Sequence, residues 1–273
     1  MNYVTETIED AGNGVWSEDR LLLSERILGV IDGATPVHKI SVDAFATQAE
    51  WLADSFAEEF VRQTEAGMDD YGKIARLVMD ELSGREELQR MKSCDRPSFT
   101  SATVTLREKK LLCQVIGDSC IYVHKKSGEV VRMTDGRVDA FSSKTAEAVE
   151  RARAEGRDEK EAAERQKLEN IRLRNSPGGY WVIAFDGAFE EELKEREFVP
   201  EEVDRLLLCT DGLERFFREF ALMTPGEFFD RRISLKQALA DLRKYEREQS
   251  GRPDFPCVKQ SDDVAAVLVE FTE

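Results

Sequence analysis

Acidic residues stand at the ends of several apolar runs, and their placement is the strongest chemical signal in the sequence. Two segments, 26–33 and 205–212, each lead an apolar run into an Asp-Gly pair, Asp32-Gly33 and Asp211-Gly212. The end of a buried strand holds its side chains in place, and the glycine lets a backbone carbonyl approach a cation. Other acids have similar settings: Glu18, Asp19, Asp118, Asp262 and Asp263. We therefore expect an acidic cluster that needs metal ions, protons or both to offset its charge.

The residue types also narrow the kind of metal. The chain has only two histidines, His38 and His124, far apart in sequence, which disfavours a histidine-rich zinc site. Carboxylates and carbonyls suit Mg²⁺ or Mn²⁺. Asp-Gly is also typical of tight turns, and we interpret the two remaining pairs, at 135–136 and 186–187, as turns.

Composition excludes several classes of protein. With 39 Lys and Arg against 55 Asp and Glu, the 273-residue chain has a formal charge of −16, which argues against nucleic-acid or anionic-membrane partners. No apolar run approaches the length of a membrane span, and the acidic N-terminus lacks the apolar stretch of a signal peptide.

The five cysteines form no CxxC pair, so we expect reduced thiols. We predict a cytoplasmic monomer.

Two kinds of pattern predict the elements that position the acids. Apolar residues at helical spacing predict three helices. The first has Ser41 as its N-cap and is followed by Gly67. The second begins at Tyr71 and is stopped by Gly84, and the third begins near Ser234. Short runs rich in Val, Ile and Leu predict strands at 20–24, 26–31, 101–107, 110–116, 121–124, 129–133, 180–185, 205–210 and 264–271. No second core is evident, so we predict one domain spanning 1–273.

A charged segment at about 144–174 stands apart from this pattern. It consists almost entirely of Ala and charged residues, which favour helix, but its apolar stripe is thin. We predict a charged helical insertion, which is either a solvated surface feature or a mobile lid over a site.

The ordered set of motifs resembles the metal-dependent protein serine/threonine phosphatases of type 2C (PPM), in their bacterial form. The matching pieces cover nearly the whole chain: SEDR (17–20), GVIDGA (29–34), SFTSATVTL (98–106), GDS (117–119), LLLCTDGL (206–213) and SDDVAAVLV (261–269). The resemblance implies an α+β fold, a four-layer α-β-β-α sandwich of two antiparallel sheets.

The resemblance also implies roles for the acids. Asp32 bridges two Mg²⁺ or Mn²⁺ ions, the Gly33 carbonyl binds one of them, and Asp211 and Asp262 complete the other site. Glu18 binds metal directly or through water, with Asp19 beside it, and Asp118 matches the acid of a looser third ion. Water activated between the two ions attacks the phosphoryl group of a phosphoprotein or another phosphomonoester. The catalytic set is thus Asp32, Asp211 and Glu18.

Two positions depart from the family's pattern. Gly14 occupies the place of a phosphate-binding arginine, and Ala34 the place of a histidine proposed as general acid in eukaryotic members. Arg20 and His38 are the nearest replacements, although a surface arginine and a loop histidine are the plainer interpretation.

The departures keep open an alternative function, a catalytically impaired metal-binding interaction module. A haloacid-dehalogenase-like mechanism is disfavoured, because Val30 stands where its nucleophilic aspartate belongs.

Overall fold

The structure is a computed structural model that describes residues 2–272 except 13, 35 and 251–259. Over these residues the strands form two sheets in which all pairs are antiparallel. The first sheet has the order β1 (Asn2–Asp10), β11 (Val264–Thr272), β10 (Val203–Cys209), β6 (Cys120–Lys125) and β7 (Val130–Met133). The second has the order β2 (Asp19–Leu23), β3 (Ile27–Gly33), β4 (Ser98–Arg107), β5 (Lys110–Ile116) and β9 (Lys194–Phe198), and the short β8 (Ile183–Ala184) pairs with β4.

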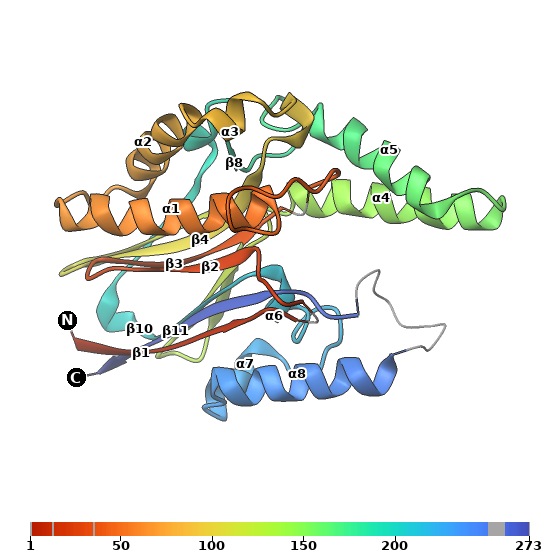
Figure 1. Ribbon diagram of the computed structural model, residues 1–273. Coiled ribbons are helices and arrows are strands. Elements are labelled where there is room, and N and C mark those ends of the chain that lie inside the picture. Colours follow the sequence, from red (N-terminus) through yellow and green to blue (C-terminus); the bar gives the residue numbers. More distant parts are fainter. Residues whose placement is uncertain (1, 13, 35, 251–259, 273) are drawn as a thin grey trace.

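Helices cover the outer face of each sheet, as Figure 1 shows. On the second sheet lie α1 (Gln48–Glu65) and α2 (Tyr71–Ser83), followed by the short α3 (Glu86–Gln89). On the first sheet lie α7 (Pro225–Asp230) and α8 (Leu235–Gln249), while the short α6 (Asp211–Glu214) follows β10. The predicted four-layer sandwich is confirmed.

Three apolar layers hold these elements together, because successive side chains of a strand point to opposite faces. On β3, Ile31 packs toward α1, and its neighbour Val30 packs between the sheets. On β10, Leu206 and Leu208 lie between the sheets while Leu207 faces α7 and α8. The ends of β3 and β10 are therefore fixed by packing on both faces.

The start of α1 corrects one prediction. Ser41 does not cap the helix: α1 begins at Gln48, and the Thr47 side chain accepts the N–H of Glu50. Before it, Val42 and Phe45 exchange backbone hydrogen bonds, and Asp43 has a φ of +50°. This tight turn keeps residues 42–46 out of the helix although Phe45 continues its apolar stripe. The predicted ends at Gly67 and Gly84 and the N-cap Ser234 are confirmed.

Two strands escaped prediction, and one predicted strand is much shorter. β1 and β9 are the outer strands of their sheets, and each carries several charged residues. Edge strands need no continuous apolar face, and charges there hinder pairing with another chain. The predicted strand at 180–185 is reduced to β8, because the Asn175 side chain accepts the N–H of Val182 in place of a neighbouring strand.

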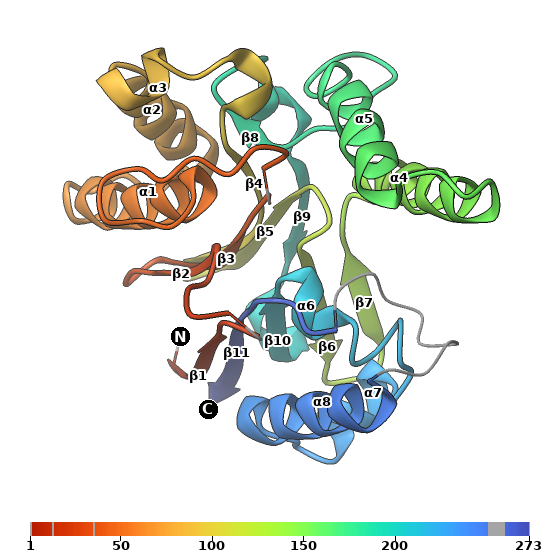
Figure 2. The ribbon, with the colours of Figure 1, turned by 45° about the vertical axis from the view of Figure 1, so that its right-hand side comes forward.

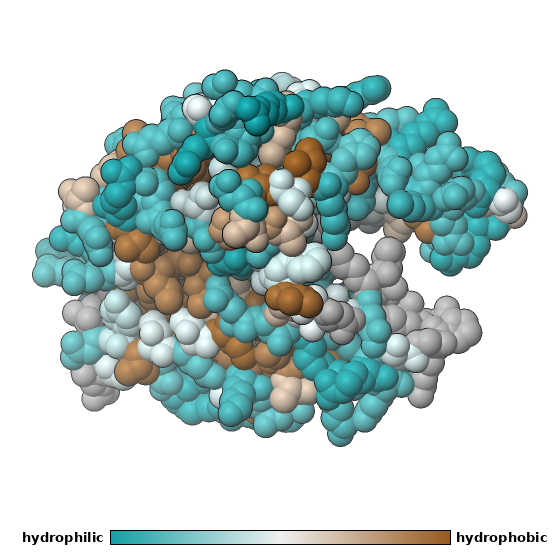
Figure 3. All heavy atoms as spheres, viewed as in Figure 1, coloured by the Kyte–Doolittle hydropathy of each residue, from teal (hydrophilic) through white to brown (hydrophobic). Residues whose placement is uncertain are grey.

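The charged segment forms two helices, α4 (Arg137–Ala154) and α5 (Glu159–Ile171), so the helical part begins before the expected boundary at 144. Figure 2 shows this α4–α5 hairpin beside the α1–α2 pair, and Figure 3 shows hydrophilic side chains over its projecting end. Within the described residues, no helix is both long and apolar enough to cross a membrane.

The two Asp-Gly pairs interpreted as turns lie outside the helices and strands: Gly136 is in a turn, and Asp186 and Gly187 form a bend. Asp135 and Gly136 precede α4, and the buried Asp135 carboxylate pairs with Arg137 and Lys194. Gly187 has a φ of +76°, which suits glycine. The four cysteines among the described residues are free, and Cys257 lies outside them.

Candidate active site

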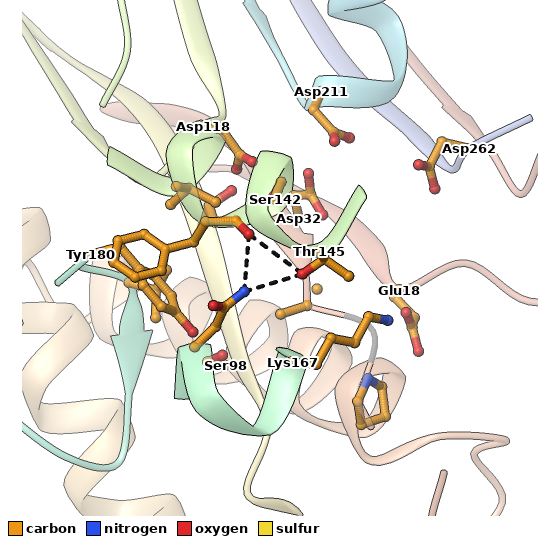
Figure 4. A pocket seen from close by; sticks show the side chains of 18 of the residues that line it. Glu18, Asp32, Ser98, Asp118, Ser142, Thr145, Lys167, Tyr180, Asp211 and Asp262 are labelled. Carbon is orange, nitrogen blue, oxygen red and sulfur yellow. Dashed lines mark hydrogen bonds between the residues drawn. The ribbon is translucent and has the colours of Figure 1, made fainter. Parts of the chain in front are cut away.

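The predicted acids line one pocket of about 740 Å³, although they come from five separate chain segments. Figure 4 shows the carboxyl groups of Asp118, Asp211, Asp262, Asp32 and Glu18 arranged around this space. The pocket lining includes every residue of the predicted metal-binding set: Glu18, Asp19, Asp32, Gly33, Asp118, Asp211 and Asp262. Asp263 and Glu214, which were not in that set, line it as well.

Neighbouring strands bring the first of these acids together. Asp19 opens β2 and lies directly opposite Asp32 on β3 in the antiparallel register. A single residue, Thr210, separates Asp211 from the end of β10. Asp262 lies just before β11, which pairs with β10. Asp118 lies in the turn between β5 and β6. The two sheets thus deliver their acids to one edge of the sandwich.

Two positions at this edge require glycine, because a neighbouring backbone segment approaches each of them closely. A Cβ on Gly33 would lie 2.5 Å from the Glu18 carbonyl oxygen, and the Gly33 N–H donates to that oxygen over 3.1 Å. A Cβ on Gly212 would lie 1.8 Å from the Asp263 carbonyl oxygen. Both Asp-Gly pairs therefore have a packing reason for their glycine, since a side chain would push apart the segments that carry the acids.

Burial and mutual repulsion both disfavour the charged forms of these acids. Burial raises the pKa of Asp32 well above its ordinary value, and the charges of Asp19 and Asp211 raise it further. Burial also raises the pKa of Asp19, whose Oδ2 is buried without a hydrogen-bond partner. Burial raises the pKa of Asp118 to about 6. The pocket thus concentrates carboxylates that lack sufficient positive charge nearby.

Glu18 is held in place from two sides. The Thr47 hydroxyl, at the N-terminus of α1, donates to the Glu18 carboxylate over 2.7 Å. The Glu18 N–H donates to the Asp263 carboxylate over 2.8 Å. Both Glu18 and Thr47 are buried, so these bonds fix the carboxylate at the pocket wall.

The acids line one pocket, but their side chains are not arranged as a complete set of metal ligands. Within the described residues, no group of three or more His, Cys, Asp or Glu side chains is arranged so that it could hold a metal ion as it stands.

The replacements considered for the two departures lie outside the pocket lining. The Arg20 guanidinium pairs with Asp54 and donates to the carbonyls of Ser17 and Asp19. The His38 ring hydrogen-bonds to Asp95 over 2.7 Å. Neither residue is among those that line the pocket, whereas Ala34 is.

The sequence left open whether the charged segment is a surface feature or covers a site, and the α4–α5 hairpin that it forms lines the pocket. The pocket that the acids line is also lined by residues of this hairpin, among them Phe141, Ser142, Thr145, Lys167, Asn170 and Ile171. The segment's composition indicates helices but contains nothing that fixes where they dock.

Comparison with known families settles the family of the chain. The family described as protein phosphatase 2C matches residues 9–250, most of the chain. The chain belongs to the protein phosphatase 2C family. It is therefore assigned to the protein serine/threonine phosphatases, a class of hydrolase. No curated protein matches it significantly.

Solved structures of bacterial phosphatases share the fold of this phosphatase. The serine/threonine phosphatase Stp1 from Staphylococcus aureus superposes with a TM-score of 0.61 at 15% identity, covering 100% of this chain and 96% of that one. The Mycobacterium tuberculosis phosphatase PstP/Ppp gives 0.57 at 17% identity, with 99% of each chain covered. The PstP catalytic domain in complex with two manganese ions gives 0.54 at 17% identity, covering 100% and 98%.

Proposed function

We propose that this chain hydrolyses phosphoserine and phosphothreonine in proteins, with two Mg²⁺ or Mn²⁺ ions held by the acidic end of the pocket. The observation that carries the proposal is the convergence of Glu18, Asp32, Asp118, Asp211 and Asp262 on one pocket. In the proposed assignment Asp32, the Gly33 carbonyl, Asp211 and Asp262 would hold the two ions. Glu18 and Asp19 would support this centre, and Asp118 would contribute to a looser third ion.

The donor set fits such ions chemically. All the groups offer oxygen, which Mg²⁺ and Mn²⁺ prefer, and burial and neighbouring acids raise the pKa values of Asp19, Asp32 and Asp118. The buried Asp19 Oδ2 has no hydrogen-bond partner and can serve as a ligand or as an acceptor for metal-bound water. A manganese complex of a protein with the same fold supports the choice of metal.

When bound, the ions supply positive charge for the phosphoryl oxygens and acidify a water for attack on phosphorus. The chain's own residues do the rest. Thr47 and Asp263 hold Glu18 in position. The rigid ends of β3 and β10 hold Asp32 and Asp211, so the acids need little reorganisation during turnover. No Ser-His or Cys-His pair is required, since water is the nucleophile.

Hydrolysis of p-nitrophenyl phosphate and of a phosphothreonine peptide, with Mn²⁺ and with EDTA, tests the proposal. We expect turnover that EDTA abolishes and that Asp211→Asn reduces at least about 100-fold, because even indirect metal contacts are worth 10–100-fold. Activity that persists in EDTA or in Asp211→Asn would exclude the mechanism. Metal binding without turnover of any phosphoester would favour the interaction module that the Gly14 and Ala34 departures keep open.

Cellular and assembly properties remain predictions. The charge of −16 favours a phosphoprotein or other phosphomonoester substrate over nucleic-acid or membrane partners. A cytoplasmic location is expected from the cysteine pattern, and we expect a monomer.

A further inference from the structure

The pocket extends well beyond the acids. Its volume of about 740 Å³ lies in the range of cavities that enclose drug-sized ligands. Besides the acids, its lining includes residues of the α4–α5 hairpin and of the segment that leads into β4. The pocket can therefore hold a second chemical group of a ligand whose phosphoryl group lies at the acids.

The segment that leads into β4 presents three residues to the pocket on one face. Thr100 on β4 lies opposite Asp32 on β3 in the antiparallel register. Side chains alternate along an extended chain, so Ser98 shares the face of Thr100. Arg96 is also extended, with φ −67° and ψ 128°, and all three residues line the pocket. An extended chain rises about 3.3 Å per residue, which places the Arg96 backbone roughly 13 Å along the strand from Thr100.

The Arg96 guanidinium has no carboxylate partner within the part of the chain that the structure describes. Its Nε is buried without a hydrogen-bond partner. The carboxylate next to it in sequence, Asp95, is hydrogen-bonded to His38. In contrast, Arg215 of the same pocket pairs with Glu219 at 2.7 Å. A cation that is partly removed from water without a counter-ion favours the binding of an anion from outside the chain.

A second arginine lies against Arg96. Arg174 follows α5 and lines the pocket, and its Nη1 donates to the Arg96 carbonyl oxygen over 3.2 Å. The Arg174 side chain is only 4% exposed. Its Nη2 pairs with Asp186 at 3.0 Å, but its Nε is buried without a partner. Among the described residues, the two arginines thus share one carboxylate, and this part of the pocket keeps a positive charge.

We propose that Arg96 and Arg174 form a second anion subsite, which takes a carboxylate or phosphate group of the substrate in addition to the phosphoryl group that is cleaved. The guanidinium fork matches the oxygens of both groups. The distance of roughly 13 Å along β4 corresponds to a few residues of an extended peptide, so the second group belongs to a neighbouring acidic or phosphorylated residue. The assignment to a substrate rests on the proposed phosphatase function, whereas the subsite itself does not.

Calorimetric titration of the metal-free protein with inorganic phosphate isolates the subsite, because the acids repel phosphate when no metal ion is bound. The protein is treated with EDTA and dialysed beforehand. Arg96→Ala is the main variant, because Arg174 contacts the backbone of Arg96 and not its side chain. Arg85→Ala is the matched control, because Arg85 is exposed and lies outside the pocket lining.

We expect Arg96→Ala to weaken anion binding at least about tenfold, the value of a charged hydrogen bond, at an unchanged melting temperature. Arg85→Ala should match the wild type, and Arg96→Lys, which keeps the charge without the fork, should fall between them. The same titration with acetate distinguishes the source of the group. Tighter binding of phosphate assigns the subsite to a second phosphate of the substrate, and tighter binding of acetate assigns it to an acidic side chain.

Equal anion binding by Arg96→Ala and wild type overturns the inference, and so does a wild-type protein that binds neither anion. Loss of anion binding in Arg96→Ala, in a protein that turns over no phosphoester, leaves the subsite standing and removes the proposed function.

Steady-state kinetics with Mn²⁺ test the use of the subsite. We expect Arg96→Ala to raise KM about tenfold for a phosphothreonine peptide with a second phosphate a few positions away. The KM for p-nitrophenyl phosphate should not change, because this substrate has no second anionic group. An equal rise in KM for both substrates would place Arg96 at the cleaved phosphoryl group and overturn the second subsite.

Discussion

Asp19 and Asp32 face each other across β2 and β3, where two like charges directly opposite destabilise a sheet. Burial raises the pKa of both carboxyls, and nearby acids raise them further. A carboxyl whose pKa is raised on folding stabilises the fold at pH values below its ordinary pKa, and that stability is lost as the pH rises through the raised value. At neutral pH, the metal-free protein therefore carries an electrostatic cost at its active site.

Asp32→Asn should raise the melting temperature of the metal-free protein at pH 7 while abolishing metal-dependent turnover. The gain is roughly 2–4 °C for each kcal/mol of repulsion removed, and it should shrink as the pH falls toward 4, where the wild-type acid is protonated. Differential scanning calorimetry in EDTA across pH 4–7 measures it. An unchanged or lower melting temperature at pH 7 would contradict the electrostatic account.

Asp135→Asn is the matched control, for which we expect the opposite effect on the stability of the protein. Burial alone would raise the pKa of Asp135, but hydrogen bonds from Arg137 and Lys194 hold it below its ordinary value. This stability is present above the ordinary pKa and lost as the pH falls through the lowered one. The substitution should therefore destabilise the protein by about 1–3 kcal/mol at pH 7. Chemical denaturation measures the loss.

At the scale of elements, the N-terminus of α1 links helix capping to the proposed metal site. Thr47 accepts the Glu50 N–H and donates to Glu18. Thr47→Ala should cost about 1 kcal/mol of stability and weaken Mn²⁺ binding about 10–100-fold, whereas Thr47→Ser keeps the hydroxyl and should restore both. Isothermal titration with Mn²⁺ decides the matter: equal affinity in Thr47→Ala would mean that Thr47 only caps the helix.

The same element shows where sequence reasoning succeeds and where it stops. The apolar runs of β3 and β10 are long enough to predict strands, so Asp32 and Asp211 could be placed at strand ends. The cap at Thr47 could not be predicted, because it depends on a turn over residues 42–46 with a left-handed Asp43. The docking of the α4–α5 hairpin at the pocket could not be predicted either, because the composition of a charged helix does not encode which surface it contacts.

At the scale of the whole molecule, the net charge should select among substrates. A chain with a formal charge of −16 attracts basic ligands and repels acidic ones, although the metal ions that we propose would bind the phosphate itself. We expect kcat/KM for a phosphopeptide flanked by Lys and Arg to exceed that for one flanked by Asp and Glu by about tenfold at low salt. The difference should narrow in 0.5 M NaCl, because salt screens surface charge. A difference in kcat/KM that does not change with salt would indicate specific contacts instead.

The most direct test of the account is anomalous diffraction at the manganese edge from crystals soaked in Mn²⁺. The account predicts two peaks in the pocket among Asp32, Asp211 and Asp262, and their loss in crystals of Asp32→Asn. Saturating Mn²⁺ with no anomalous peak among these acids would contradict it, because the carboxylates would then meet for a reason other than metal-dependent hydrolysis.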